Sequence, residues 1–592
     1  MKHNLLSAAL LLGFALLVVS APGATIWYVD GTTGSDLTGT GTAGNPWATI
    51  QHAIDHPSVL DGDSVLVAMG SYPENLNIHK GIALGGSGVE ILLTSLSASS
   101  EGVGVAIASD NVELYGLTFT PAVGIDEGGS LVYAYDPGDG AISGLVIDGC
   151  YFDTEGTAPP AGVDGLTCLT LHNPVGAQVG HSDFVIDGGI LGTRADNAIL
   201  CFAGSADGVR NNSILGNHIT SYSTAGIGIG IRPGTGDSDD AGAANFDLVD
   251  NYISWGIGTA IELRDEETGA SEGITDILLE HNSMYYDDTA IRIHGLANDP
   301  GAGISDVRIC RNVDLYNTIA NGCGLHISQT GTGTTNIDFG SIRMRGSTFA
   351  GHSICGVLND VPGAVFDARY NAWGSDDGPD DDAGIINGTG DRISTGVDAT
   401  SFITGTHMNS GFTEVTSAGA TGEIDISAAN IRGAVKIDLD PGVTGEVDMS
   451  LVAHSSGIPQ GYTGIVNGKG LDYTMIINSD LADGDFVALL EYHCNSFLVT
   501  TMMGVSEEDV LIYSWDELGP AWVPTVFQNT TGTPTWLGVS PPPSPPYGPH
   551  LGEHGVDTAN DFAWAVVDHF TEFTAGEGIS GVPVELSVFS GD

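Results

Sequence analysis

Ionisable side chains recur at matching positions of three short apolar segments, AIELR at 260–264, AIRIH at 290–294 and GLHIS at 324–328. If the isoleucines and leucines of these segments point to a core, their neighbours point outward, because side chains alternate along a strand. The alignment predicts two surface-exposed columns of chemically useful residues: Glu262, Arg292 and His326 in the first, and Arg264 and His294 in the second.

These five side chains are the candidate catalytic residues. A polysaccharide lyase needs a base that removes the proton beside a uronate carboxylate and a cation that stabilises the enolate. Histidine or arginine could supply the base, and arginine or calcium the cation. The alternative is structural, because Glu262 and Arg292 would also form an ordinary ion pair between neighbouring strands of a solvated sheet.

Two acidic clusters could hold calcium, which takes about six to eight oxygen ligands from carboxylates and carbonyls. The larger cluster contains Asp376, Asp377, Asp380, Asp381 and Asp382, and the smaller contains Asp237, Asp239 and Asp240. Neither has the spacing of an EF-hand, so solvated loop charge is the alternative interpretation. Calcium is the one cofactor that the sequence suggests.

Other sequence motifs are less informative. The sequence has no GxSxG, HExxH, phosphate-binding P-loop or Cys-x-x-Cys motif. Seven cysteines in 592 residues are too few for a disulfide framework. Cys323 and Cys355 are one repeat apart, so a disulfide between neighbouring coils is geometrically allowed, with stacked free thiols as the alternative.

The charge balance restricts the partners. The chain has 74 acidic and 16 basic residues, which gives a formal net charge of −58. Nucleic acids and anionic membranes need lysine and arginine to neutralise phosphate, so neither is an expected partner. Such self-repulsion favours a divalent cation or a salty medium.

A repeat of roughly 31 residues runs through the first two thirds of the chain. Each unit has a short apolar run, then Gly or Asn, then another apolar residue; the anchors are Gly116, Gly149, Gly188, Asn217, Asn251, Asn282, Asn312, Gly346 and Asn371. Alternation with period two and many β-branched residues indicate coils of short parallel strands. Asn217, Asn251, Asn282 and Asn312 should then stack, each amide bonding to the next.

Two segments carry a resemblance to a known fold. Residues 27–86, WYVDGTTGSD…GNPWATIQHAID…DGDSVLVAMGSYPENLNIHKGIALGG, resemble the N-terminal stretch of secreted bacterial members of the pectin-lyase-like superfamily. The resemblance implies a short helix near 49–55 that covers the end of a right-handed parallel β-helix, with Trp47, Ile50, Ala53 and Ile54 closing it. RYNAWGSDDGPDDDAG, from Arg369, resembles the Asn-Trp-Trp-Gly…Gly-Pro end of such helices, with Ala372 replacing the first Trp.

The predicted fold class is all-β, a right-handed parallel β-helix over 25–400 followed by an antiparallel β-sandwich-like domain over 405–580. Residues 1–21 are typical of a secretory signal peptide, with an apolar run that is short for a membrane span. The Pro-rich stretch 541–549 should be an exposed stiff loop. VDTANDFAWAVVDHFTEF at 556–573 resembles a C-terminal module of bacterial surface proteins. The tail at 581–592 weakly resembles the segment before a sorting domain, so the natural protein is expected to be longer.

These features lead to two functional hypotheses for a secreted or cell-surface protein without a transmembrane segment. The first is a non-catalytic structural, adhesive or glycan-binding rod. The second is a carbohydrate-active enzyme, a polysaccharide lyase or glycoside hydrolase. It would act along the two columns described above, which contain Glu262, Arg292, His326, Arg264 and His294 and are called the Glu262 strip below. A polysaccharide or surface glycan is the expected partner in both, and a groove beside the strip would favour the enzyme.

Overall fold

A computed structural model describes residues 24–577 with gaps. The gaps are 96–102, 123–128, 139, 155–165, 187–196, 203–208, 222–225, 234–241, 255–256, 266–272, 286–287, 299–302, 311, 316–321, 370, 376, 400–401, 403–405, 417–421, 429–430, 441–442, 454–464, 466–472, 480, 482, 495–504, 517–520 and 571. The chain divides into two compact units, residues 1–374 with 379–401, and residues 375–378 with 402–592.

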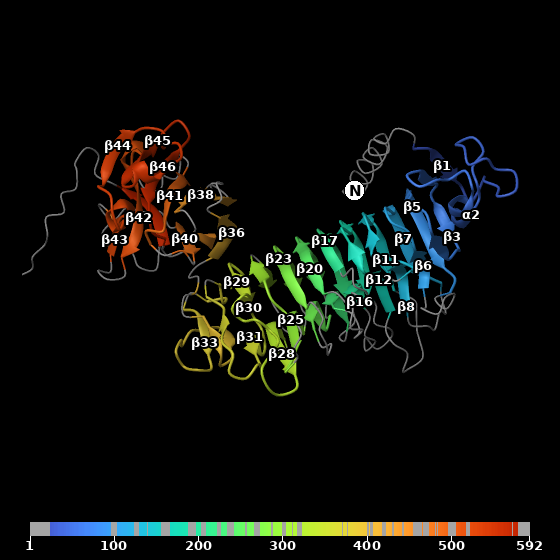
Figure 1. The fold of residues 1–592 in the computed structure, drawn as a ribbon, viewed down its shortest axis with the longest axis horizontal. Coiled ribbons are helices and arrows are strands. Elements are labelled where there is room, and N and C mark those ends of the chain that lie inside the picture. The colour runs from blue at the N-terminus through green and yellow to red at the C-terminus, as the bar shows by residue number, and fades with distance from the viewer. Residues whose placement is uncertain are drawn as a thin grey trace, which may run out of the picture. The chain divides into compact units, whose positions relative to one another are not determined.

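The first unit is a stack of coils whose strands pair in parallel (Figure 1). A 21-stranded sheet contains β1 (Ile26–Val29), β2 (Ser64–Val67), β3 (Gly70–Tyr72), β5 (Ala83–Leu93), β7 (Glu113–Pro121), β9 (Ile142–Ser143), β10 (Val146–Asp148), β11 (Tyr151–Asp153), β13 (Pro174–Val175), β14 (Gln178–Gly180), β15 (Asp183–Ile186), β17 (Val209–Leu215), β18 (His218–Ser221), β20 (Ala243–Val249), β21 (Tyr252–Ser254), β23 (Ile274–Glu280), β24 (Ser283–Tyr285), β26 (Val307–Cys310), β27 (Val313–Leu315), β29 (Arg343–Arg345) and β30 (Thr348–Ala350).

A 12-stranded sheet forms another side of the same coils. It contains β4 (Leu76–Ile78), β6 (Val103–Ile107), β8 (Gly129–Ala134), β12 (Leu166–His172), β16 (Asn197–Phe202), β19 (Ile227–Arg232), β22 (Thr259–Arg264), β25 (Thr289–Leu296), β28 (Cys323–Thr330), β31 (Cys355–Asn359), β33 (Pro379–Asp381) and β34 (Gly390–Ile393). A two-stranded sheet of β32 (Phe366–Asp367) and β35 (Val397–Asp398) completes the unit.

The predicted asparagine ladder is confirmed. The Nδ2 atoms of Asn217, Asn251 and Asn282 each donate to the Oδ1 atom of the next ladder asparagine, at 3.0 Å in all three cases, and Asn312 ends the run. Each Oδ1 atom also accepts from the backbone N–H of the preceding ladder residue. The four side chains are buried, so their amides satisfy polar groups that would otherwise be costly inside the stack.

The anchor predicted at Gly188 lies outside the described residues. In that coil the ladder position is held by Ser182, whose backbone N–H donates to Asn217 Oδ1 at 3.0 Å. The residue before it, His181, has a left-handed φ of 47°. Gly216 and Asp250, which precede their ladder asparagines, are also left-handed, with φ values of 65° and 56°. This turn is hard to find in the sequence because Ser182 takes the place of the asparagine that marks the next four coils.

The predicted N-terminal helix is α2 (Ile50–Asp55). Thr49 is its N-cap residue, and the two carboxylate oxygens of Glu74 accept from the first backbone N–H groups, Ile50 and Gln51, at 2.9 Å each. The residues expected to close the end of the stack are all fully buried: Trp47, Ile50, Ala53 and Ile54. No helix within the described residues is long and apolar enough to cross a membrane.

Within its described residues, the second unit forms two six-stranded, mostly antiparallel sheets. One contains β36 (Thr406–Thr416), β39 (Thr444–Ala453), β40 (Tyr473–Ser479), β42 (Val510–Asp516), β43 (Ala521–Pro524) and β47 (Glu572–Glu577); the other contains β37 (Gly422–Ala428), β38 (Ile431–Leu439), β41 (Phe486–Cys494), β44 (Thr535–Val539), β45 (Glu553–Asp557) and β46 (Phe562–Val567). Short 3₁₀ turns lie at η3 (Glu507–Asp509), η4 (Thr525–Gln528) and η5 (Gly548–His550). Side chains of both sheets form one apolar core, so the all-β fold class is confirmed.

The Pro-rich stretch, predicted to be an exposed loop, contains one buried residue. Tyr547 is 2 % exposed and packs with Leu489, Phe562 and Trp564 on the other face of the β41–β46 pair. The indole Nε1 of Trp564 donates to the backbone oxygen of Ser540 at 2.8 Å. The stretch is therefore anchored by an aromatic side chain, which a proline count alone does not reveal.

Candidate functional site

The three strands of the predicted strip pair in the expected register. In β22, β25 and β28, Glu262 lies opposite Arg292, which lies opposite His326. Arg264, His294 and Ser328 form the second column in the same way. The alternating residues Ile261, Ile291 and Leu325 are buried. The facing of the strip therefore follows from the apolar pattern, as expected.

The prediction that the first column is exposed is wrong for Glu262, whose side chain is only 3 % exposed. Its Oε2 atom accepts from Arg232 at 2.9 Å, and its Oε1 atom lies 3.9 Å from an Arg292 nitrogen. Arg232 was not among the predicted site residues. It reaches Glu262 diagonally from β19, where Gly230 is the direct register partner. Because Gly230 has no side chain, there is space for the Arg232 side chain beside Glu262, and a long side chain can reach a diagonal neighbour.

His326, at the other end of the first column, pairs with Asp360, which directly follows β31. Its Nε2 atom lies 2.9 Å from Asp360 Oδ2, and its side chain is largely buried. Burial lowers the pKa of His326, and nearby Arg292 lowers it further, while Asp360 acts in the opposite direction. A largely buried, neutral imidazole beside a carboxylate can accept a proton, so this pair keeps the chemistry of a general base.

The second column is also held by hydrogen bonds. His294 Nδ1 lies 2.8 Å from Ser328 Oγ, and His294 Nε2 lies 3.0 Å from Thr330 Oγ1, so both ring nitrogens have hydroxyl neighbours. Arg264 is half-buried at the end of β22. Within the described part of the strip, Glu262, His326 and His294 therefore each have a hydrogen-bonding or ion-pair partner.

The larger predicted calcium cluster is dispersed. Asp376 lies outside the described residues, and so do all members of the smaller cluster, Asp237, Asp239 and Asp240. Asp382 pairs bidentately with Arg392 at 2.6 and 2.8 Å. Asp381 is buried and accepts from the backbone N–H groups of Ala383 and Ile385, whereas Asp377 and Asp380 are exposed. Within the described part of the chain, no three acidic, histidine or cysteine side chains are grouped as a metal site would require.

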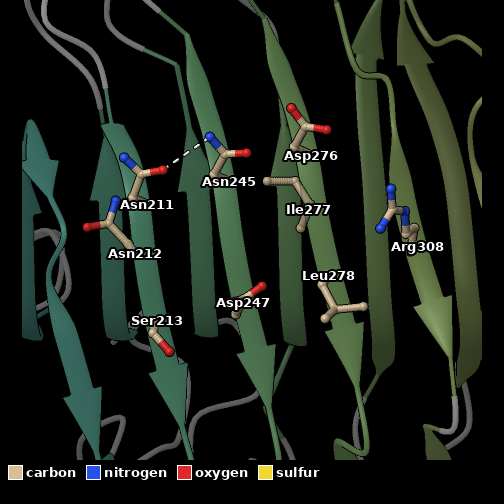
Figure 2. A pocket seen from close by; sticks show the side chains of 9 residues that line it. All are labelled: Asn211, Asn212, Ser213, Asn245, Asp247, Asp276, Ile277, Leu278 and Arg308. Atoms are coloured by element: carbon tan, nitrogen blue, oxygen red, sulfur yellow. Dashed lines mark hydrogen bonds between the residues drawn. The ribbon is translucent and has the colours of Figure 1, made fainter. Parts of the chain in front are cut away.

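A polar hollow that the sequence reasoning missed lies on the 21-stranded sheet (Figure 2). It has a volume of about 530 Å³ and extends over β17, β20, β23 and β26. Nine residues line it: Asn211, Asn212, Ser213, Asn245, Asp247, Asp276, Ile277, Leu278 and Arg308. We call it the polar hollow below.

One row of the lining is set by strand register. Ser213, Asp247, Leu278 and Arg308 are successive partners on the four strands, so they form one outward column at the strand spacing of about 4.8 Å. Asp247 is exposed, and Arg308 is half-buried. Figure 2 shows this row running across the ribbons below the asparagine side chains.

A second row comes from corner residues. Asn211, Asn245 and Asp276 have φ values of 57°, 56° and 54°, and all three are exposed. Asn and Asp tolerate this left-handed conformation better than other residues with a side chain. Asn245 Nδ2 donates to Asn211 Oδ1 at 3.2 Å, the contact drawn in Figure 2.

The sequence contained a signal for this row. Each corner residue precedes the left-handed turn residue of its own coil by five positions: 211 and 216, 245 and 250, 276 and 281. Two Asn, Asp, Gly or His residues at this spacing, followed by the ladder asparagine, mark these coils in the sequence.

Two lining residues belong to the framework. Asn212 is buried, and its amide accepts from Ala177 N–H at 2.8 Å and donates to Pro174 O at 2.9 Å. Ile277 is also buried. The groups that a ligand could meet are therefore the amides, hydroxyl, carboxylates and guanidinium of the two rows, together with the aliphatic surface of Leu278.

No protein family matches the sequence, and no curated protein matches it. Among solved structures, the chain is similar to the tailspike protein of E. coli bacteriophage HK620, with 10 % identity over 94 % of this chain and 86 % of that one, at a TM-score of 0.38. It is also similar to a GH136 lacto-N-biosidase from Eubacterium ramulus, with 12 % identity over 52 % and 67 %, at 0.24. A pectin methylesterase from Aspergillus niger shares 16 % identity over 58 % and 87 %, at 0.26. These likenesses concern the fold and carry no argument about substrate.

Proposed function

We propose that this chain is a secreted or cell-surface, non-catalytic protein that binds a neutral glycan in the polar hollow. The observation that carries the proposal is the lining of that hollow. Exposed amides and carboxylates, one hydroxyl and one guanidinium face solvent over four consecutive coils. Sugar hydroxyls both donate and accept hydrogen bonds, and this lining supplies acceptors and donors together.

The charge of the molecule supports a neutral glycan over an acidic one. The hollow contains two carboxylates, Asp247 and Asp276, against one guanidinium, Arg308, and the whole chain carries −58. A polyanion would be repelled by this field unless a cation bridged it. A neutral chain of sugars meets no such barrier.

The Glu262 strip supports a non-catalytic assignment. Glu262 is buried between Arg232, which donates to its Oε2 atom, and Arg292, which lies 3.9 Å from its Oε1 atom, so two cations balance its charge. A carboxylate in this position stabilises the neighbouring coils and is poorly placed to accept a substrate proton. This matches the structural alternative considered for the strip.

The experiment is a panel of neutral and acidic polysaccharides offered to the full chain. Affinity electrophoresis and calorimetry report binding, while unsaturated ends and new reducing ends report cleavage. We expect retention by at least one neutral glycan without product. Cleavage of any member would replace this proposal with an enzyme, and absence of binding across the panel would leave a purely structural rod.

A carbohydrate-active enzyme is the second candidate, favoured by the His326–Asp360 pair. The lowered pKa of His326 keeps its imidazole neutral near pH 7, and Arg292 lies beside it as a cation. If product forms in the panel, His326→Ala should lower turnover at least about 100-fold, the usual scale for losing a general base. An unchanged rate would remove this pair from the mechanism.

A further inference from the structure

Two cysteines meet on adjacent coils near the end of the 12-stranded sheet. Cys323 opens β28, Cys355 opens β31, and the two residues are direct partners in the parallel register. Their Sγ atoms lie 3.1 Å apart, and both side chains are buried. Neighbouring strands are about 4.8 Å apart, within the Cα separation of about 4.4 to 6.8 Å that a disulfide requires.

Other buried cysteines of the first unit have different surroundings. Cys201 faces Leu171 and Ile231 across its two strand partners. The thiol of Cys150 contacts the backbone oxygens of Leu114 and Asp148. The register thus singles out Cys323 and Cys355, and a rotation of either side chain by a modest angle would close the remaining gap between the sulfurs.

The pair is also chemically poised. The hydrogen bond from the Cys355 thiol lowers the pKa of Cys323, although burial acts in the opposite direction, and the same hydrogen bond raises the pKa of Cys355. Cys323 is therefore the better attacking thiolate, since the thiolate and not the thiol is the nucleophile.

We propose that Cys323 and Cys355 are joined by a disulfide once the chain meets a disulfide oxidant. The Cys323 thiolate attacks one sulfur of the oxidant, whose S–S bond breaks and releases one thiolate. The Cys355 thiolate then attacks the Cys323 sulfur of the mixed disulfide and releases the second oxidant thiolate. The two cysteines lose two electrons, and their two protons end on the two thiols of the reduced oxidant.

The bond would connect the last coils of the stack. It closes a loop between residues 32 positions apart, and it joins β28 to β31. β31 pairs in turn with β34, which lies next to the terminal strand β33. A terminal strand lacks a partner on one side, so coils separate most easily at the end of a solenoid. A crosslink there limits opening of the final coils.

The test uses the full chain incubated with oxidised glutathione in mild urea, so that the buried thiols are transiently reached. Remaining thiols are alkylated under denaturing conditions, and the chain is digested with trypsin. Cys323 and Cys355 fall in different peptides, residues 312–343 and 346–369, because Arg311, Arg343, Arg345 and Arg369 bound them. We expect these two peptides as a linked pair that separates on reduction.

Stability gives an independent readout. Reductant should lower the melting temperature of the oxidised parent by several degrees, as loss of a crosslink does. It should not change the melting temperature of the Cys323→Ser variant, whereas the matched Cys201→Ser variant should respond as the parent does. Circular dichroism checks that each variant is folded. Full alkylation of both peptides, or linkage of either cysteine to a different one, would overturn the proposal. The peptide masses are measured on the parent chain, so this outcome does not depend on whether a variant folds.

Discussion

Two outward-facing carboxylates, one on each large sheet of the solenoid, differ in exposure, which is low for one and high for the other. On the 12-stranded sheet, Glu262 is 3 % exposed and lies between two arginines. On the 21-stranded sheet, Asp247 is exposed at the centre of the polar hollow, with Ser213 and Leu278 as its direct register partners. Both carboxylates sit at outward positions of parallel strands, so strand position alone does not explain the difference.

The difference lies in the neighbours on adjacent coils. Glu262 has Gly230 on one side, and the vacant space admits the long side chain of Arg232 over it. Asp247 has short or aliphatic neighbours that cannot cover it. A long cation on an adjacent coil turns a surface carboxylate into a structural ion pair, whereas short neighbours leave it available to a ligand.

The largest expected difference between the two sheets is in the loss of unfolding free energy when the carboxylate of each is replaced by an amide. Glu262→Gln leaves two guanidinium groups without their carboxylate, so we expect a loss of about 2 kcal/mol in the free energy of unfolding. Asp247→Asn changes an exposed side chain and should cost less than about 0.5 kcal/mol. Urea titrations of both variants measure this. Equal losses would mean that burial does not distinguish the two carboxylates.

Glycan affinity should respond in the reverse sense. Asp247→Ala and Arg308→Ala each remove a charged hydrogen-bonding group from the hollow, so we expect at least about tenfold weaker binding of the glycan found in the panel. Glu262→Gln should stay within about twofold of the parent. Arg343→Ala is the matched control, because Arg343 follows Arg308 in register but does not line the hollow. Weaker binding by Glu262→Gln alone would move the site to the other sheet.

Acid should destabilise the sheet of Glu262 more than that of Asp247. The folded state lowers the pKa of His326, so unfolding takes up a proton, and the stability given by the neutral imidazole is lost as pH falls below its unfolded value of about 6.5. His326→Gln should therefore flatten the loss of unfolding free energy between pH 7.5 and 5.5, by at most about 1.4 kcal/mol per pH unit. Asp247→Asn should follow the parent, and an unchanged slope for His326→Gln would contradict this account.

Calcium should give the smallest effect. We expect chelator to lower the melting temperature by a few degrees at low salt, because a cation bound by the native state alone adds to its stability. The ligands that the sequence predicts are Asp376, Asp377, Asp380, Asp381 and Asp382. The effect should be small because Asp382 is already paired with Arg392, and Asp381 with backbone N–H groups. If chelator has no effect while sodium chloride raises the melting temperature, screening of the net charge of −58 is sufficient.

Much of the architecture could be predicted from sequence because it repeats. The period placed Asn217, Asn251, Asn282 and Asn312 in one buried column, and alternation fixed the register of Glu262, Arg292 and His326. Both inferences depend on strand geometry, in which a slip of one residue would bury the charges. The ladder position at Ser182 does not follow from the asparagine pattern, because that residue has a hydroxyl in place of the amide.

The sequence by itself determined the all-β solenoid and which residues face outward, since these depend on local periodicity. The helix α2 that covers the end of the stack was implied by the resemblance of residues 27–86. Only the tertiary structure decided which of the outward-facing groups remain available to a ligand. Whether Glu262 is covered depends on the reach of Arg232 from another coil, and the polar hollow depends on corner residues from coils 31 and 34 positions apart. Such contacts join residues whose separation varies from coil to coil, so their distances are set by the stacked backbone and not by spacing along the chain.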